Sequence, residues 1–345
     1  MNPITLSVVL TSLAFGTAFV FSSSHWLLAW MGLEVNTLAI IPLMTQHKHP
    51  RAIEATTKYF LTQASASALL LFSSLNNAWF TGEWSIMDLT NPLSCTLMTI
   101  AICMKLGLAP FHFWLPEVLQ GLSLITGLIL STWQKLAPMA ILFQISPTLN
   151  TPLLLTIGIL STLVGGWGGL NQTQLRKILA FSSIAHLGWM VSVLPFSPQL
   201  MILNLVIYLI MTSAMFLTLK TISSTKISTL ATSWSKTPVT TALSLLTLLS
   251  LGGLPPLSGF VPKWFILQEL TSQSTTILAT IMALSALLSL FFYLRLTYVV
   301  TLTSSPNMSN APITWRHYSK QSTLALSIVL ILSSCIMPIS PLFIT

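Results

Sequence analysis

Long apolar stretches follow one another along almost the whole chain, and they restrict its fold more than any other feature. Of the 345 residues, 53% are hydrophobic and only 6% are charged, with a mean hydropathy of +0.83. Soluble domains carry roughly 25% charged residues, so this chain has too few to build a water-facing surface. A helix needs about 20 apolar residues to cross a bilayer core. The sequence therefore predicts an all-α, polytopic membrane protein.

By this length criterion the chain contains about eleven membrane spans, joined by short connections. Their approximate ranges are 3–22, 25–45, 55–76, 92–120, 122–145, 149–170, 174–195, 198–220, 238–271, 274–302 and 321–343. The first segment has neither a basic leader nor a small-residue cleavage site, which indicates a retained span and not a removable signal. We expect residues 1–345 to form a single transmembrane domain.

The formal net charge of +8 does not indicate a nucleic-acid partner. Proteins that bind nucleic acid gather Lys and Arg in stripes on a soluble face, whereas here they are scattered singly between apolar runs. The cysteines Cys95, Cys103 and Cys335 show no CxxC spacing, which favours small buried side chains over a metal or iron–sulfur site. We expect membrane lipids as surroundings and no metal.

The basic residues divide sharply when successive loops are assigned to alternate sides of the membrane. One side holds none, and its longest loop carries Glu83 and Asp88. The positive-inside rule places the other side, and the N-terminus with it, on the negative face of an energised membrane. An odd number of spans places the C-terminus opposite. The basic side holds Lys48, Arg51, Lys58, Arg176, Lys177, Lys220, Lys226, Lys236, Arg295, Arg316 and Lys320.

The remaining lysines, Lys105, Lys135 and Lys263, lie inside apolar spans, and so does Glu34. An ionisable side chain near the bilayer centre costs at least roughly 2.5–3.5 kcal/mol on insertion scales, so it usually has a function. The alternative is a structural ion pair, or a lysine that extends to the headgroups along its carbon stem. Four such residues in one chain favour the functional interpretation.

A lysine with a movable partner can carry protons. Burial favours the neutral form of a lysine, and a nearby carboxylate favours the charged form. If Glu34 lies beside Lys105, it would hold a proton there. Withdrawal of Glu34, or a charge on Lys135, would favour release of that proton.

Two spans also contain helix-breaking segments, at residues 105–116 and 251–264. Proline removes an amide donor and glycine tolerates unwound backbone. Open backbone at membrane depth is tolerated only against protein or a water-filled cavity, so both breaks predict a polar interior. A simple kinked helix is the alternative.

The two breaks resemble an internal repeat. Pro110 and Pro116 are six residues apart, as are Pro256 and Pro262, and a Leu-Gly pair precedes each set. The breaks fall in the fourth and ninth spans, an odd offset that makes the two repeats run in opposite directions. Paired broken helices in inverted halves are a sequence indicator of a transport pathway.

Two histidines are further candidates for proton transfer, because imidazole titrates near neutral pH. His112 follows the first break, and His186 lies in the middle of the span at 174–195. A hydrogen-bonded packing role is an equal alternative for both. Glu117 and Glu269 flank the broken segments and are interpreted as facing headgroups or loop water.

Three segments together resemble a known family: WMGLE at 30–34, KLGLAPFHFWLPE at 105–117 and GGLPPLSGFVPKW at 252–264, following the opening Met-Asn-Pro. The chain resembles the antiporter-like membrane subunits of respiratory complex I, in their mitochondrial vertebrate form. The resemblance covers the whole chain. It implies two inverted five-helix halves, here about 1–220 and 238–343, each with a broken helix.

The resemblance also implies a function for the buried charges. Glu34 would pair with Lys105, Lys135 would link the halves, and Lys263 would gate the far half-channel. Protons would move from the mitochondrial matrix to the intermembrane space, driven by NADH-to-ubiquinone electron transfer. The N-terminus would face the matrix. Unlike bacterial members, the chain lacks their first three helices, which puts transport by this chain alone in doubt.

Redox cofactors are expected in partner subunits, since the sequence offers no Rossmann glycine fingerprint and no cysteine cluster. FMN, iron–sulfur clusters, NADH and ubiquinone would all bind there, so this chain would take part in an enzyme without redox chemistry of its own. Two other functions stay open: a secondary cation/proton antiporter that works alone, and a scaffold subunit whose lysines are structural.

Overall fold

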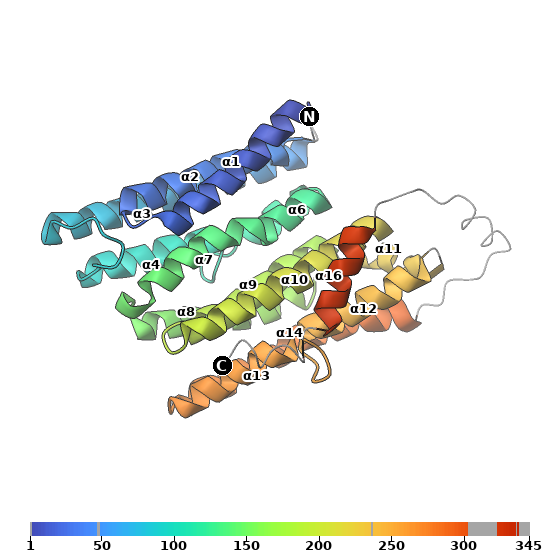
Figure 1. The fold of residues 1–345 in the computed structure, drawn as a ribbon. Helices are drawn as coiled ribbons and strands as arrows, with labels where there is room; N and C mark the ends of the chain where they lie inside the picture. The colour runs from blue at the N-terminus through green and yellow to red at the C-terminus, as the bar shows by residue number, and fades with distance from the viewer. Residues whose placement is uncertain (1, 47–48, 236, 303–322, 336, 338–345) are drawn as a thin grey trace. The chain divides into compact units, whose positions relative to one another are not determined.

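The computed structural model describes residues 2–46, 49–235, 237–302, 323–335 and 337. Within these ranges the regular secondary structure is helical, as the sequence predicts (Figure 1). The chain divides into two compact units, Met1–Ser161 with Leu187–Pro198, and Thr162–His186 with Gln199–Thr345. Each unit is described by itself.

The helices fall largely within the predicted ranges, three of which are each divided between two helices. In chain order they are α1 (Pro3–Ser22), α2 (Trp26–Met44), α3 (Pro50–Thr81), α4 (Pro92–Leu106), α5 (Trp114–Gly121), α6 (Leu124–Ser131), α7 (Trp133–Ile145), α8 (Thr151–Gly169), α9 (Leu175–Val193), α10 (Pro198–Ile222), α11 (Ile227–Ala231), α12 (Pro238–Gly252), α13 (Phe260–Ser272), α14 (Thr276–Leu302) and α16 (Leu324–Cys335). Short 3₁₀ turns at Ser146–Thr148 and Thr232–Ser235 complete the set.

Six helical stretches of the described chain are long and apolar enough to cross a membrane. These are α1, α2, the stretch Leu124–Thr148, α8, α10 and α14. Helices α4, α12 and α16 are also apolar but shorter. Helix α3 falls outside this class because it carries buried polar residues, among them Gln63, Ser73 and Asn77, which lower its mean hydropathy.

The first two helices approach each other closely through glycine. A Cβ atom placed on Gly16 would lie 3.0 Å from the carbonyl oxygen of Gly32, and the reverse distance is the same. Small residues let helix backbones approach in membrane proteins, where apolar surface alone gives little drive for association. Figure 1 shows α1, α2 and α3 lying side by side.

Both predicted helix breaks are present. Helix α4 ends before Gly107, whose φ is +77°, and α12 ends before Gly253, whose φ is +81°. Each glycine occupies the left-handed region that other residues disfavour. Its N–H and that of the next residue bond back to carbonyls of the last helical turn, which is the Schellman arrangement. Helices α5 and α13 then resume after irregular segments.

A third interruption lies at Thr132, where the sequence analysis expected one continuous span at 122–145. Thr132 has φ −110° and ψ −70° and separates α6 from α7. Its Oγ1 donates to the Leu128 carbonyl, 2.7 Å away, and such side-chain bonding bends helices. Pro138, inside α7, lacks the N–H that would bond the Gln134 carbonyl. The two effects together account for the interruption.

Candidate functional site

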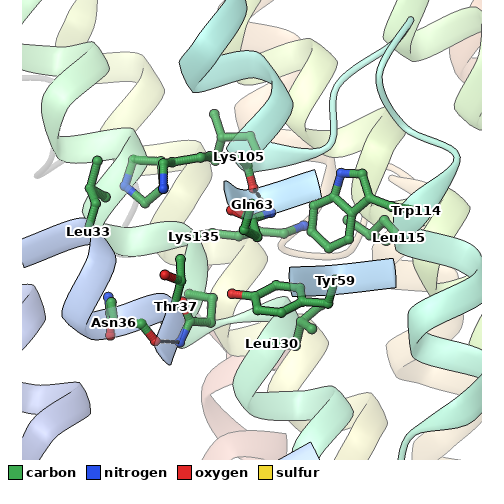
Figure 2. Close-up of a pocket in the computed structure, with 13 residues that line it drawn as sticks. Leu33, Asn36, Thr37, Tyr59, Gln63, Lys105, Trp114, Leu115, Leu130 and Lys135 are labelled. Atoms are coloured by element: carbon green, nitrogen blue, oxygen red, sulfur yellow. Dashed lines mark hydrogen bonds between the residues drawn. The ribbon is translucent and has the colours of Figure 1, made fainter. Parts of the chain in front are cut away.

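A polar cavity in the first unit lies between α2, α3, α4, α5, α6 and α7. It has an empty volume of about 400 Å³. Figure 2 shows the polar ends of Gln63, Tyr59 and the two lysines gathered around this space. The residues that line it are Leu33, Asn36, Thr37, Tyr59, Gln63, Lys105, Leu106, Trp114, Leu115, Leu130, Gln134, Lys135 and Pro138. Two of the lysines predicted from sequence therefore share one cavity.

Lys105 reaches the cavity from the last turn of α4, immediately before the break. Its side chain is 6% exposed, and its Nζ is buried without a hydrogen-bond partner. The unpaired carbonyls at a helix C-terminus carry partial negative charge. The break therefore provides an electrostatic environment for this ammonium, which a continuous helix would not.

Glu34 approaches from α2, where it is partly buried. Its carboxylate acts electrostatically on Lys105 and on the Tyr59 hydroxyl. No direct bond joins it to Lys105, since Glu34 Oε2 and Lys105 Nζ are both buried without hydrogen-bond partners. The two groups lie within electrostatic reach of each other, but they do not form a contact ion pair.

Lys135 lies in the first turn of α7, just after the interruption at Thr132, and is 4% exposed. A helix N-terminus carries partial positive charge, the opposite of the environment of Lys105. Helix ends thus favour a positive charge more at Lys105 than at Lys135. Next to it, Gln134 Nε2 donates to the Asn36 carbonyl at 3.1 Å, which ties α7 to α2.

The uncharged polar residues of the cavity, among them Gln63, Asn36 and Tyr59, were not predicted from the sequence. Gln63 Nε2 donates to the Lys105 carbonyl at 3.4 Å. Both amide atoms of the buried Asn36 lack hydrogen-bond partners, and Tyr59 stacks edge-on with Trp114, their ring centroids 5.7 Å apart. Their only signal in the sequence is an uncharged polar side chain within an apolar span, which is a weaker indication of function than an ionisable one.

Lys263 belongs to the second unit, where it lies in the first turns of α13. Its Nζ donates to the Gly252 carbonyl at 2.8 Å, and its side chain is 8% exposed. The ammonium therefore caps the C-terminal end of α12 by reaching back across the break. Lys105 lies at the corresponding end of α4 as a member of that helix. The two lysines reach similar helix ends from opposite sides of their breaks.

The register of the two breaks shows that these lysines are not equivalent. Aligning Gly107 with Gly253, both at positive φ, also aligns the two proline pairs. Lys263 then corresponds to Glu117 and not to Lys105. The breaks are thus similar in backbone but carry their charges at different positions.

Glu117 is engaged in an exposed ion-pair cluster. Lys58 Nζ lies 2.6 Å from a carboxylate oxygen of Glu117 and 2.6 Å from one of Glu54. Lys58 is 41% exposed and Glu117 is 52% exposed. The cluster joins α5 to α3. In the second unit, the partly buried Glu269 accepts from Gln273 Nε2 at 3.2 Å.

Neither of the two candidate histidines lines the polar cavity. His112 is in the irregular segment after Gly107, is buried, and packs against Phe113 with ring centroids 4.2 Å apart. It is not among the residues that line the cavity. His186 lies in α9 within the second unit, also buried, and its ring centroid is 5.5 Å from that of Tyr208.

Metal binding has no candidate in the described part of the chain, which contains no group of three or more His, Cys, Asp or Glu that could hold an ion. The fold and site thus define a class: a multi-pass helical membrane protein with broken helices, lysines at the helix ends and a polar cavity. Proteins of this class transport ions or protons.

Comparison with known proteins narrows the class. Residues 23–289 match the model of the NADH:quinone oxidoreductase/Mrp antiporter transmembrane family, and residues 290–344 match the NADH dehydrogenase subunit 2 C-terminus. NADH-ubiquinone oxidoreductase chain 2 of Xenopus laevis is 87% identical over the full length of both chains. That of Salmo salar is 64% identical over 99% of this chain and 98% of its own.

Two solved structures have the same fold as this chain. A chain of respiratory complex I from Thermus thermophilus matches with a TM-score of 0.84 and 26% identity, over 98% of this chain and 80% of that one. A chain of the Mrp complex from Dietzia shares the fold, with a TM-score of 0.81 at 17% identity over 97% and 75%. The chain belongs to the NADH:quinone oxidoreductase/Mrp antiporter transmembrane family, in its NADH dehydrogenase subunit 2 branch.

Proposed function

We propose that this chain is a membrane subunit of mitochondrial respiratory complex I and conducts protons through the cavity that Lys105 and Lys135 share. The observation that carries the proposal is that cavity, with the Glu34 carboxylate acting on Lys105. The chain is 87% and 64% identical to two vertebrate NADH-ubiquinone oxidoreductase chains 2 over almost their whole length. This similarity supports membership of the complex and association with its other membrane-arm subunits.

Proton transfer in the first unit would begin with Lys105. Its ammonium is favoured by the α4 carbonyl end and by Glu34, so this lysine would hold a proton while Glu34 stays charged and near. Movement or protonation of Glu34 would weaken the binding of this proton by Lys105. The proton would then pass to Lys135 through the Tyr59 hydroxyl or along water that the Gln63 and Asn36 amides would hold by hydrogen bonds.

The next proton-transfer step would take place in the second unit. Lys263 is held by a backbone carbonyl and not by a carboxylate, so it would bind a proton less firmly than a lysine in an ion pair. We assign it the gate of the far half-channel. His186 is proposed as a proton carrier of the same unit, and His112 as one at the first break.

Contacts between loops support the predicted orientation. The loop after α8 pairs with the loop after α10 through Gln174 and Lys226, and Arg295 donates to the carbonyls of Leu170 and Gln172. These loops belong to the basic side. On the other side, His25 pairs with Ser85, joining two loops that contain no Lys or Arg. We assign the basic side, with the N-terminus, to the matrix.

The proposal includes eleven spans in two inverted halves within a single domain. The predicted ranges each contain a helix or a pair of helices, except that the last range lies partly outside the described residues. The shared glycine conformation at Gly107 and Gly253 supports the repeat. FMN, iron–sulfur clusters, NADH and ubiquinone are assigned to partner subunits, so the chain contributes to NADH:ubiquinone reduction without redox chemistry of its own.

The experiment that tests this function compares Lys105→Ala with Lys226→Ala in membranes that carry each variant. Lys226 is exposed in a loop, so its loss controls for removal of one lysine charge. We expect Lys105→Ala to leave the amount of assembled complex on a native gel unchanged, with impaired or uncoupled NADH oxidation. If activity fell only in proportion to assembled complex, Lys105 would be structural and the proposal would fail.

A further inference from the structure

The end of α4, where Lys105 lies, is covered by side chains from two neighbouring helices. Trp114 Nε1 of α5 donates to the Met104 carbonyl at 3.2 Å, and Gln63 Nε2 of α3 donates to the Lys105 carbonyl at 3.4 Å. Both side chains are buried and line the same cavity as the lysine (Figure 2). The last four carbonyls of a helix have no partner within it. Groups from outside α4 therefore satisfy two of the four carbonyls at this end.

Trp114 is held in place from two sides. Its ring lies edge-on to that of Tyr59, with centroids 5.7 Å apart, and a Cβ atom on Gly107 would lie 3.2 Å from the ring. The indole therefore has little room to turn away from the Met104 carbonyl. A buried tryptophan N–H usually has a hydrogen-bond partner, and here that partner is the end of α4.

The ammonium of Lys105 takes no part in these bonds. Its Nζ is buried without a hydrogen-bond partner among the described residues, although a lysine near a helix C-terminus can donate to the last carbonyls. A donor that binds a terminal carbonyl also reduces the partial negative charge which that carbonyl offers to a cation. Trp114 and Gln63 thus compete with the lysine for the end of its own helix.

The second break shows the opposite arrangement. In the register of the two breaks given above, Trp114 corresponds to Phe260, whose ring has no N–H to donate. There a lysine binds the helix end itself, since Lys263 Nζ donates to the Gly252 carbonyl at 2.8 Å. A lysine is thus bound to the helix end at the break where the aromatic side chain lacks a donor.

We propose that Trp114 and Gln63 are positioning residues for Lys105, which deepens the proposed function and rests on it. By donating to the end of α4, they keep the ammonium from binding there. The ammonium then stays in the cavity, where it can give up its proton. The position of these two donors, and not only the buried charges, sets how firmly Lys105 holds that proton.

Three titratable groups from other helices surround Lys105. Glu34 acts on it from α2, and Tyr59 of α3 and Lys135 of α7 line the same cavity. Helices α5 and α6 contribute only Trp114 and apolar side chains to the lining. The two positioning residues do not titrate, so replacing them leaves all of these charges in place. A shift in pH dependence would therefore report on the bonds at the helix end.

The test uses Trp114→Phe and Gln63→Met in assembled complex. Phenylalanine keeps an aromatic ring and methionine keeps the length of glutamine, but neither donates a hydrogen bond. Trp133→Phe is the matched control, because Trp133 Nε1 donates to the Leu13 carbonyl at 3.5 Å and Trp133 does not line the cavity. The readout is the rate of NADH-driven proton uptake by vesicles as a function of pH, with native gels for the amount of complex. Lys105→Ala is measured alongside.

We expect each positioning variant to free a carbonyl, to which the Lys105 ammonium then binds. The lysine would hold its proton more firmly, so a higher pH would be needed for release. The pH of maximal proton uptake should therefore rise by about one unit, the size expected for one hydrogen bond to a charged group. Trp133→Phe should keep the profile of the unsubstituted chain.

A lower rate at every pH, with a profile that is unshifted or displaced to lower pH, would refute the inference and leave the two residues a packing role. An unchanged rate and profile would refute it as well. In either case the proposed function stands if Lys105→Ala lowers proton uptake per NADH. If Lys105→Ala leaves that ratio and the turnover unchanged, the proposed function fails, and this inference with it. If one positioning variant prevents assembly, the other decides.

Discussion

Gly107 combines two constraints of which Gly82 has only the first. Its φ of +77° is close to the +76° of Gly82, but the surroundings differ. A Cβ atom on Gly107 would lie 3.0 Å from Leu115 Cδ1 and 3.2 Å from the Trp114 ring, whereas on Gly82 it would meet nothing within 4 Å. Gly107 thus needs both the left-handed backbone and the missing side chain.

This difference gives a residue-scale prediction. Gly82→Ala should cost about 1–2 kcal/mol, the usual penalty for an L-residue in left-handed backbone. Gly107→Ala should cost more, because Leu115 and Trp114, which both line the cavity, must also move. Thermal unfolding of the purified complex would measure the difference. Equal losses for the two variants would contradict the packing argument.

The site residues that could be recognised from the sequence were the charged ones. Lys105, Lys135 and Lys263 stood out because an ionisable group is costly in a bilayer. Asn36 and Gln63 did not, because uncharged polar residues are tolerated in membrane helices and their function depends on what they face. Only the fold shows that Asn36 lines the cavity and that Gln63 donates to the Lys105 carbonyl.

At the scale of elements, the second break is fixed by close backbone contact. A Cβ atom on Gly259 would lie 1.8 Å from the Ser250 carbonyl oxygen, with the backbone of Gly259 at an ordinary φ of −69°. The segment after the break therefore lies directly on α12. Gly252, at the end of α12, has only ordinary contacts with Tyr293 at 3.7 Å and beyond.

This contact predicts opposite results for two glycines seven residues apart. Gly259→Ala should greatly reduce the amount of assembled complex, because backbone and not a flexible side chain must move. Gly252→Ala should assemble normally, since its site has room for a methyl group and alanine favours helix. Native gels of the two variants would test this. Normal assembly of Gly259→Ala would show that the segment does not pack on α12 as described.

The attachment of α5 to α3 gives a third prediction. Lys58 bridges Glu54 and Glu117 at the surface, and exposed ion pairs contribute little and are screened by salt. Lys58→Met should lower the thermal stability of the complex slightly at low salt and not at high salt. Glu83→Gln, which alters an exposed carboxylate of another loop, is the control. A loss that salt leaves unchanged would indicate a role beyond the ion pairs.

The interruption at Thr132 shows where prediction of elements from sequence ended. The glycine and proline clusters at 105–116 and 251–264 are strong signals for a break. Pro138 was one proline in an apolar run, and proline is tolerated in membrane helices when other groups satisfy the freed carbonyl. The position of the interruption depends on the Thr132 bond to Leu128, which sequence does not reveal.

For the whole molecule, the all-helical, multi-pass character followed from hydropathy. The arrangement that forms the cavity did not, because it depends on which polar faces meet. Residues of α2, α3, α4 and α7 contribute to one cavity although they are separated by up to about a hundred positions. The order of spans constrains such contacts only weakly.

The orientation of the chain gives a prediction at this scale. Cysteine introduced at Lys226 should react with a membrane-impermeant thiol reagent from the matrix side only, and cysteine at Glu83 from the opposite side only. Both positions are exposed. The native Cys95 and Cys103 are buried, and the unsubstituted chain provides the background. Labelling of both positions from one side would contradict the assigned topology.

The central claim is that Glu34 and Lys105 move protons and do not merely stabilise the fold. The most direct measurement is the number of protons taken up per NADH oxidised by vesicles that contain assembled complex with Glu34→Gln or Lys105→Met. Both substitutions preserve side-chain size while removing the charge. The account predicts normal assembly with a lowered proton ratio or with loss of turnover. Normal assembly, turnover and proton ratio in both variants would contradict it.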